Sequence, residues 1–406
     1  MRWRIRRPEF FLLIDADTRH NFRIDMLAAC TFSLFNVVFN QFYMPMAIDA
    51  GASGIEVGLL AAAPAVGLIL SPLWSVWIER ASSPRPFTIY TNIVARLLIL
   101  LPAIFGTPLM FVIAALGFHL LIGIHMPAYA SLMTRIYPPN CRGRLMGYVR
   151  VAMGGIMIPL AYLVGKWSDV YGASGPLAAA AITGALSITM YYFLKETAAP
   201  ARPPIAAKRA SFGEQWRLVR ENRELGIFLI ATTFAGFGNI LAQPLYQLVQ
   251  KQELALSFMQ IGLARTTYFA FLLLTYVIAG ALIDRMASRQ VVLGGIAAYA
   301  LVPLLYGLSE SFPVVIIGSG IQGLGDAIWD IGIMAYVFRL APDRVAVVFG
   351  LHLLLFGIRG TIAPLISTAL TGILPYSVMF LAAAAASAVG VAVFMLGRRG
   401  SEQPAK

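Results

Sequence analysis

Apolar runs of about 20 residues recur along almost the whole chain, and each is long enough to cross the ~30 Å hydrocarbon core of a bilayer as one helix. They are far longer than the roughly 10-residue strands of a membrane barrel. The composition agrees, because 59% of the 406 residues are hydrophobic and only 12% are charged. The sequence therefore predicts an all-α polytopic membrane protein with twelve transmembrane helices. The predicted spans are residues 24–47, 54–78, 86–105, 108–134, 145–168, 175–194, 225–249, 257–283, 290–308, 312–338, 346–372 and 375–396.

The basic residues predict the orientation. Most of the 31 Lys and Arg residues fall in segments that are cytoplasmic if both termini are cytoplasmic, and membrane proteins favour positive charge in their inner loops. We therefore expect a multi-pass protein of the bacterial cytoplasmic (plasma) membrane. The formal net charge of +12 then faces the anionic lipids of the bilayer, so it does not indicate a nucleic-acid partner.

No pattern in the chain indicates a cofactor, a metal or catalysis. Cys30 and Cys141 are the only two cysteines, and both are expected on the reducing side, so no disulfide is predicted. His119 and His125 fall on different helix faces, and no carboxylate accompanies them at metal-ligand spacing. A phosphate-binding GxxxxGKS/T loop is also missing from the sequence. We therefore predict no metal, no cofactor and no enzymatic activity.

The two halves of the chain resemble each other. A shift of about 203 residues brings NVVFNQFY, residues 36–43, onto NILAQPLY, residues 239–246. Because an even number of spans separates the copies, both point the same way across the membrane, as in transporters built from parallel repeats. The predicted organisation is a cytoplasmic segment (1–23), a six-helix bundle (24–195), a cytoplasmic linker (196–224), a second six-helix bundle (225–397) and a cytoplasmic tail (398–406).

The linker contains a short amphipathic pattern, SFGEQWRLVRENREL, at residues 211–225. Ser211 and Glu214 have the spacing of a capping box, and apolar residues fall along one side of the helix that would follow. We favour an interfacial helix on the inner leaflet. A disordered tether is the alternative.

One loop carries a family resemblance. The segment GALIDRMASR, residues 280–289, resembles the GxxxD(R/K)xGx(R/K) signature of the major facilitator superfamily, with Ala287 where the family usually has glycine. SVWIERASSPR, in the first half, is a more degenerate copy. The resemblance covers all twelve spans, and it implies two bundles that rock against each other and a protein that works as a monomer. The conformational gate that it implies consists of Glu79, Arg80, Gly280, Asp284, Arg285 and Arg289.

The resemblance also implies a central cavity, which the first, fourth, seventh and tenth spans of this family line. The polar residues of the two related stretches each occupy one helix face. Amides and phenols at mid-membrane need partners, which a wet cavity or a substrate can provide. Hydrogen bonds that only hold helices together are the alternative. The predicted substrate-cavity residues are Asn36, Asn40, Tyr43, His125, Tyr129, Asn239, Gln243, Tyr246 and Trp329.

Two carboxylates in the tenth span are the sharpest polar signal. Asp326 and Asp330 are four residues apart and lie on one helix face inside an apolar region. Counted from the short turn that follows, Asp326 and Arg359 of the next span lie at similar depth, so a buried ion pair between them is expected, with His352 nearby. Such groups mark proton and substrate pathways. The hypothesis is that Arg359 keeps one carboxylate ionised while the other, Asp330, exchanges a proton; a static ion pair is the alternative.

Taken together, these patterns predict a secondary active transporter that moves a small organic solute by alternating access and uses a proton gradient. Aromatic residues in the predicted cavity favour efflux over uptake. Arg96 and Arg265 are isolated charges in the third and eighth spans, and they are weaker candidates for the site. A transport-inactive membrane sensor or scaffold of the same fold is the alternative function. A membrane-embedded enzyme ranks last, because no nucleophile and base occur together.

Overall fold

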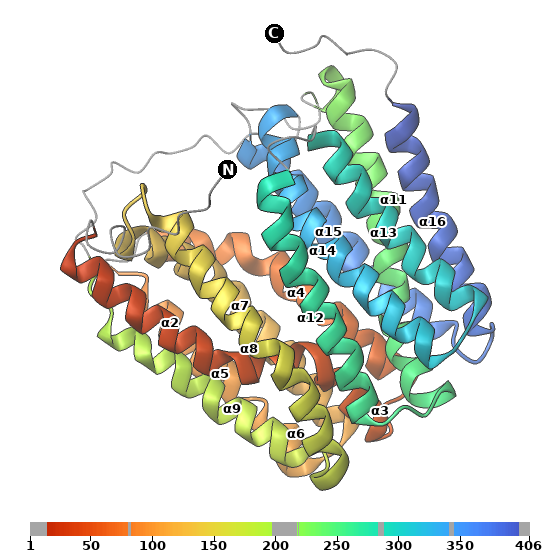
Figure 1. Ribbon diagram of the computed structural model, residues 1–406, viewed down its shortest axis with the longest axis horizontal. Coiled ribbons are helices and arrows are strands. Elements are labelled where there is room, and N and C mark those ends of the chain that lie inside the picture. Colours follow the sequence, from red (N-terminus) through yellow and green to blue (C-terminus); the bar gives the residue numbers. More distant parts are fainter. Residues whose placement is uncertain are drawn as a thin grey trace, which may run out of the picture.

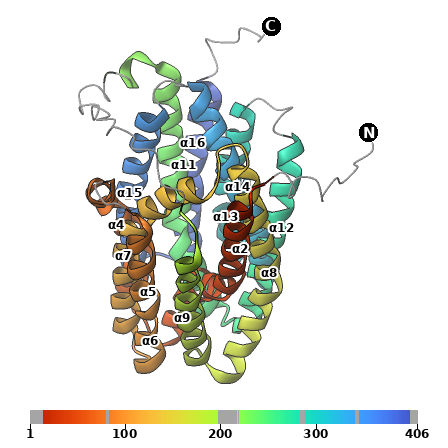
Figure 2. The same cartoon turned by 90° about the vertical axis from the view of Figure 1, so that its left-hand side faces the viewer.

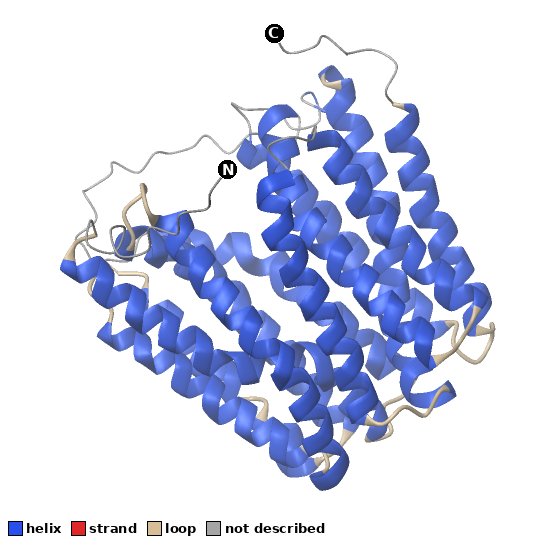
Figure 3. Ribbon diagram, in the orientation of Figure 1, coloured by secondary structure: helices blue, strands red, loops and turns tan. Residues whose placement is uncertain are grey.

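The structure is a computed structural model that describes residues 14–79, 83–196, 217, 219–282, 288–340 and 345–397. Within these residues the chain is helical almost throughout and contains no β-strand (Figure 3). Eleven helical segments are long and apolar enough to cross a membrane, and a further helix, α4, extends over Gly54–Glu79. The predicted all-helical membrane fold is confirmed. Most of the predicted linker helix lies outside the described residues.

The first bundle holds the first six spans. Its first helix begins at Ala16 rather than at the predicted residue 24, because the Asp15 carboxylate accepts from the Thr18 N–H at 3.2 Å and caps the helix. The helices of this bundle are α2 (Ala16–Val37) with the π-helical turn η1 (Val38–Phe42) and α3 (Tyr43–Asp49), α4, α5 (Arg85–Leu97) with α6 (Leu100–Phe105), α7 (Pro108–Ile136), α8 (Arg142–Tyr171), and α9 (Ser174–Thr189) with η2 (Met190–Phe193).

The second bundle repeats this arrangement, and in it α13 packs between α14 and α16. Glycines let the helices approach closely: a Cβ on Gly238 would lie 2.2 Å from the carbonyl oxygen of Ala383, so α11 and α16 meet there backbone to backbone. The helices of this bundle are α11 (Arg223–Leu248) with the π-helical turn η3 (Val249–Glu253), α12 (Phe258–Leu282), α13 (Ser288–Leu308), α14 (Phe312–Leu340), α15 (Val345–Ala369) and α16 (Tyr376–Leu396).

Two helix pairs join the bundles. α8 packs on α12, and α4 packs on α15. Figure 1 shows the two bundles side by side, and Figure 2 shows the first bundle in front of the second. We call the end at which α2 begins and α16 ends the inner end, and the opposite end the outer end. The bundles lean apart toward the inner end and meet toward the outer end (Figure 1).

Direct contacts close the outer end. The Lys251 ammonium lies 2.7 Å from the Asp49 carboxylate of the other bundle. The Asp169 carboxylate, near the end of α8, accepts from the backbone N–H groups of Phe258 and Met259 at 2.6 and 2.8 Å, and so satisfies donors at the start of α12 that have no partner within that helix. The structure is therefore closed at the outer end.

Candidate functional site

Two adjoining cavities lie between the bundles. The outer cavity has a volume of about 300 Å³ and the inner cavity about 230 Å³. Four residues line both cavities: Ala61 and Pro64 of α4, Gln243 of α11 and Asp326 of α14. The walls come from both halves of the chain, which places the cavities where a rocking motion of the bundles would act.

The first polar stripe faces the outer cavity only in part. Asn40 lies in the π-helical turn η1 and lines the cavity, while its amide donates to the Asn36 side chain at 3.2 Å. Asn36 itself lines neither cavity. Tyr43 lines the outer cavity, but its hydroxyl donates to the Phe111 carbonyl oxygen at 2.8 Å. This stripe therefore both lines the outer cavity, through Asn40 and Tyr43, and forms hydrogen bonds within the protein.

The second stripe contributes to both cavities. Gln243 lines both, Tyr246 lines the outer cavity, and Asn239 lines the inner cavity. The buried Tyr246 hydroxyl and the Asn239 side-chain oxygen have no hydrogen-bond partner among the residues that the structure describes. Buried polar atoms without a partner are costly, so atoms of this kind beside a cavity suit a ligand or water.

Asp326 is held by three donors. The hydroxyls of Tyr268 and Tyr299 each donate to its carboxylate at 3.0 Å, and the Gln322 amide donates at 3.1 Å. These donors come from α12, α13 and α14, so three helices of the second bundle position this one carboxylate. Among the described residues, no cation lies within 4.0 Å of it.

The expected Asp326–Arg359 ion pair is not formed in this conformation, although both residues line the inner cavity. Arg359 donates instead to the Thr232 carbonyl oxygen of α11 at 2.8 Å. The expectation assumed that successive spans pack together, whereas α15 packs mainly on α4 and α11 and makes few contacts with α14. Similar depth brought the two side chains into one cavity without bringing them into contact.

The other predicted site residues separate into two groups. Trp329 and His352 line the inner cavity, with their rings 5.7 Å apart. Asp330 lines neither cavity and accepts from the Tyr276 hydroxyl at 2.6 Å. His125 and Tyr129 line neither cavity, and their rings lie 5.4 Å apart at a tilt of 39°.

Several cavity residues were missed by the sequence interpretation. Gln247 and Gln250 extend the second stripe by one and two turns beyond Gln243, and Gln322 is one turn before Asp326, so helical spacing could have found them. Arg265 was set aside as an isolated charge, yet it lines the outer cavity. No pattern in the sequence predicts that three further tyrosines line the cavities. Tyr268 and Tyr306 line the outer cavity, and Tyr299 lines the inner one.

Most of the predicted conformational gate falls outside the part of the chain that the structure describes. Arg80, Asp284 and Arg285 lie outside the described residues, and the surroundings of Glu79 and Gly280 are likewise not described. Arg289 is described, and its guanidinium donates to the Phe394 carbonyl oxygen, which joins α13 to α16.

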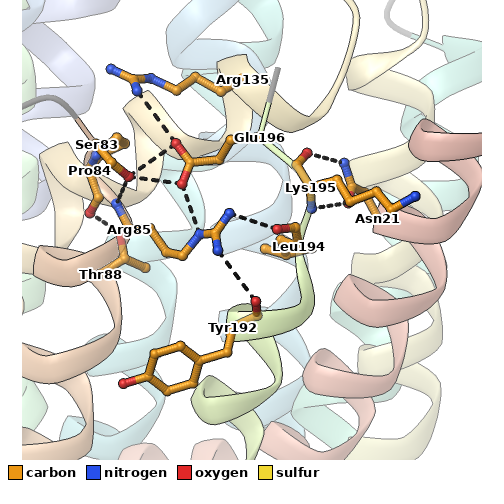
Figure 4. Close-up of polar contacts among 10 residues, drawn as sticks. All are labelled: Asn21, Ser83, Pro84, Arg85, Thr88, Arg135, Tyr192, Leu194, Lys195 and Glu196. Carbon is orange, nitrogen blue, oxygen red and sulfur yellow. Dashed lines mark hydrogen bonds and ion pairs between the residues drawn. The ribbon is translucent and has the colours of Figure 1, made fainter. Parts of the chain in front are cut away.

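A different network occupies the inner end of the first bundle (Figure 4). The Glu196 carboxylate accepts from the Ser83 hydroxyl at 2.8 Å, from Arg85 at 2.8 Å and from Arg135 at 3.4 Å. Arg85 also donates to the carbonyl oxygens of Tyr192 and Leu194. The end of the sixth span is thereby tied to the third and fourth spans.

Comparisons with solved structures agree with this architecture. The nucleoside transporter NupG superposes with a TM-score of 0.73 at 14% identity, over 94% of this chain and 99% of that one. An auto-inhibited peptide transporter of the POT family gives 0.72 at 14% identity, over 95% and 99%. A bacterial homologue of the human lysosomal transporter Spinster, in an inward-facing and unoccupied conformation, gives 0.57 at 12% identity, over 95% and 96%. At these identities the likeness shows the fold alone.

No curated protein matches the sequence. The sequence model of the Major Facilitator Superfamily, however, matches residues 26–250 and 228–406, which together include every span. The repeated six-helix bundles, the cavity between them and this match lead to one conclusion: the chain belongs to the major facilitator superfamily of membrane transporters.

Proposed function

We propose that this transporter couples the export of a small organic solute to a proton gradient, with Asp326 as the residue that exchanges the proton. The observation that carries this proposal is that Asp326 lines both cavities. An ionisable group inside the membrane is costly and commonly serves a proton or substrate pathway. A carboxylate that meets both cavities can exchange a proton from either side as the bundles rock.

The closed outer end supports alternating access. In this conformation, contacts such as Asp49 to Lys251 hold the outer end shut, while the bundles lean apart at the inner end (Figure 1). Opposite opening and closing would expose the same cavities to the other side. With the termini cytoplasmic, as the basic residues favour, this conformation faces inward.

The direction of export rests on the cavity walls. Aromatic rings line both cavities, including Phe39 and Tyr306 in the outer one and Phe356 in the inner one. Such walls suit a solute with an apolar or planar part that enters from the inner side. The alternative function, a sensor or scaffold without transport, has the same fold and is distinguished by the test below.

The test uses the purified full-length protein in liposomes with an imposed pH gradient. Radiolabelled organic acids, sugars, nucleosides, amino acids and cationic drugs are offered with the gradient in either direction. We expect gradient-driven movement of at least one compound by the wild type. Asp326→Asn should lose the gradient dependence and keep exchange of that compound down its own gradient, while Asp330→Asn should keep both.

Three outcomes would contradict parts of the proposal. Full gradient dependence in Asp326→Asn would show that this carboxylate does not carry the proton. Loss of that dependence in Asp330→Asn alone would return the role to Asp330, as the sequence interpretation had it. A folded wild type that moves no compound would favour the sensor.

A further inference from the structure

We infer that the solute is an organic anion, and that its negative group binds Arg265 in the outer cavity. This inference deepens the proposed function and rests on it, since it names the class of solute that the same cavities would carry. It follows from the charges that line the cavities, from the unused donors of Arg265 and from the neutral polar atoms around them.

The charges around the cavities do not balance. The charged residues that line them are Arg265 and Arg359, against the single carboxylate of Asp326. Among the described residues, no carboxylate lies within 4.0 Å of either guanidinium. A charge away from bulk water is costly unless an opposite charge neutralises it. An anionic solute would supply the missing negative charge.

Arg265 is the better placed of the two arginines to bind that charge. A guanidinium has five N–H donors, and the hydrogen bond of Arg265 to a described residue is a long one, 3.4 Å to the Gln250 side-chain oxygen. Its Nε–H is buried, and the described part of the chain offers it no acceptor. Gln250 is itself anchored, because its amide donates to the Tyr306 hydroxyl at 3.0 Å. The donors of Arg265 are therefore positioned and available.

Arg359 and Asp326 are each held by neighbouring groups, although the Arg359 Nε–H, like that of Arg265, has no acceptor among the described residues. Arg359 donates to the Thr232 carbonyl oxygen at 2.8 Å and packs so tightly on α11 that a Cβ on Gly236 would lie 2.6 Å from its Cζ. The Asp326 carboxylate accepts from Tyr268, Tyr299 and Gln322. Asp326, the one carboxylate that lines the cavities, forms no ion pair with Arg265 within 4.0 Å. A counter-charge for Arg265 is therefore left to the solute.

Neutral polar atoms nearby indicate the rest of the solute. The side-chain oxygens of Gln247 and Gln322 and the Tyr246 hydroxyl are buried without a partner within the described ranges. All three residues line the outer cavity. Carbonyl-type oxygens accept hydrogen bonds, so they suit hydroxyl or N–H groups on the solute. The volume of about 300 Å³ lies at the small end of ligand sites. The expected solute is a small organic anion that also carries hydroxyl or N–H groups.

The experiment compares matched pairs of compounds that differ in one anionic group. Thermal unfolding of the detergent-purified full-length protein is followed with lactate and lactamide, gluconate and glucose, benzoate and benzamide, and uridine monophosphate and uridine. We expect the anionic member of at least one pair to stabilise the protein and its neutral partner to have no effect. A ligand at about a hundred times its Kd raises the unfolding free energy enough to be detected.

Variants identify the site. Arg265→Gln should weaken binding of the stabilising anion by about tenfold to a hundredfold, which is the range for hydrogen bonds to a charged group. Arg265→Lys keeps the charge without the planar fork, so its Kd should fall between those of the wild type and Arg265→Gln. This variant carries the test if Arg265→Gln does not fold. Lys166→Gln, which removes an exposed cation of α8, is the matched control and should bind as the wild type does.

The inference is overturned if a neutral partner stabilises as well as its anion, if both Arg265 variants bind as tightly as the wild type, or if no anion stabilises the protein. A neutral compound that binds and is moved in the liposome assay would refute the anion while transport stands. An anion that binds through Arg265 and is not moved would refute transport while the anion site stands. The two proposals can therefore fail separately.

Discussion

Single carboxylates in this protein differ in how they are neutralised. Glu196, at the inner end of the first bundle, has a side chain only 15% exposed and accepts from two arginines, Arg85 and Arg135. Asp17, close by, has a side chain 62% exposed and pairs with Lys195 at 2.6 Å. Exposed ion pairs contribute little because water screens them, whereas removing one partner of a buried pair leaves charges without compensation. The contact of Asp17 with Lys195 is therefore expected to contribute less to stability than the contacts of Glu196, although it is shorter.

We expect Glu196→Gln to lower the free energy of unfolding by about 2 kcal/mol, because Arg85 and Arg135 both lose the negative charge of this buried carboxylate. Asp17→Asn is the matched control and should cost less than about 1 kcal/mol, since its pair is exposed. Thermal or denaturant unfolding of the two variants in the same detergent makes the comparison. Equal losses in both would show that the Glu196 network does not stabilise the first bundle.

At the scale of elements, α8 packs differently along its length. Its outer part meets α12, where a Cβ on Gly165 would lie 2.3 Å from the carbonyl oxygen of Phe258. At Gly155, nearer the middle of the same helix, no atom of the described neighbouring residues lies within 4 Å of such a Cβ. Small residues permit close helix contact in membranes. The absence of a side chain at Gly165 is thus what allows the bundles to close there.

Gly165→Ala should therefore disfavour the conformation that is closed at the outer end. Overpacking a tight contact costs about 1–3 kcal/mol, which corresponds to a shift of roughly fivefold to a hundredfold between the two conformations. Distances between spin labels on the outer ends of α8 and α12, in a variant without Cys30 and Cys141, would report it. Gly155→Ala is the control on the same helix, and an equal shift there would exclude a contact-specific cause.

At the scale of the whole molecule, the two bundles act as bodies joined by few polar contacts. The ion pair of Asp49 with Lys251 links α3 to η3 across the outer end. The Lys251 ammonium also lies 4.1 Å from the centre of the Phe258 ring, and its side chain is 10% exposed. The Asp49 side chain is 53% exposed, so water screens this pair from the Asp49 side only. The pair stabilises one conformation of the transporter rather than the fold of either bundle.

Lys251→Gln should accordingly raise the population that is open at the outer end. The unfolding temperature of the protein should stay close to that of the wild type. The exchange of charges, Asp49→Lys with Lys251→Asp, should restore the closed population at least in part, because the attraction is kept. Single-molecule distance measurements between the bundles would follow both variants. If the double variant were as open as Lys251→Gln, the attraction would not be what closes the outer end.

The candidate site was predictable only where its pattern is local. The spacing of Gln243 and Tyr246 along α11, and that of Asp326 and Asp330 along α14, predicts polar helix faces, and Gln243, Tyr246 and Asp326 line the outer cavity. His125 and Tyr129 are predicted only from their place on the fourth span, which the family resemblance puts beside the cavity. They line neither cavity, because membership of a span does not say which face of the helix a residue occupies. The π-helical turns η1 and η3 alter helix faces in a way that regular periodicity does not anticipate.

The sequence by itself predicts that the chain lies in a membrane, how many spans it has and that the second bundle repeats the first. It can do so because hydrophobicity and internal similarity are properties of the chain read residue by residue. Which helices pack together is settled in three dimensions. Because α15 packs on α4 and α11, Arg359 binds Thr232 instead of Asp326, and because α12 faces the space between the bundles, the isolated Arg265 becomes part of a cavity. Partners of buried polar groups depend on contacts between distant parts of the chain, and only the packed structure contains them.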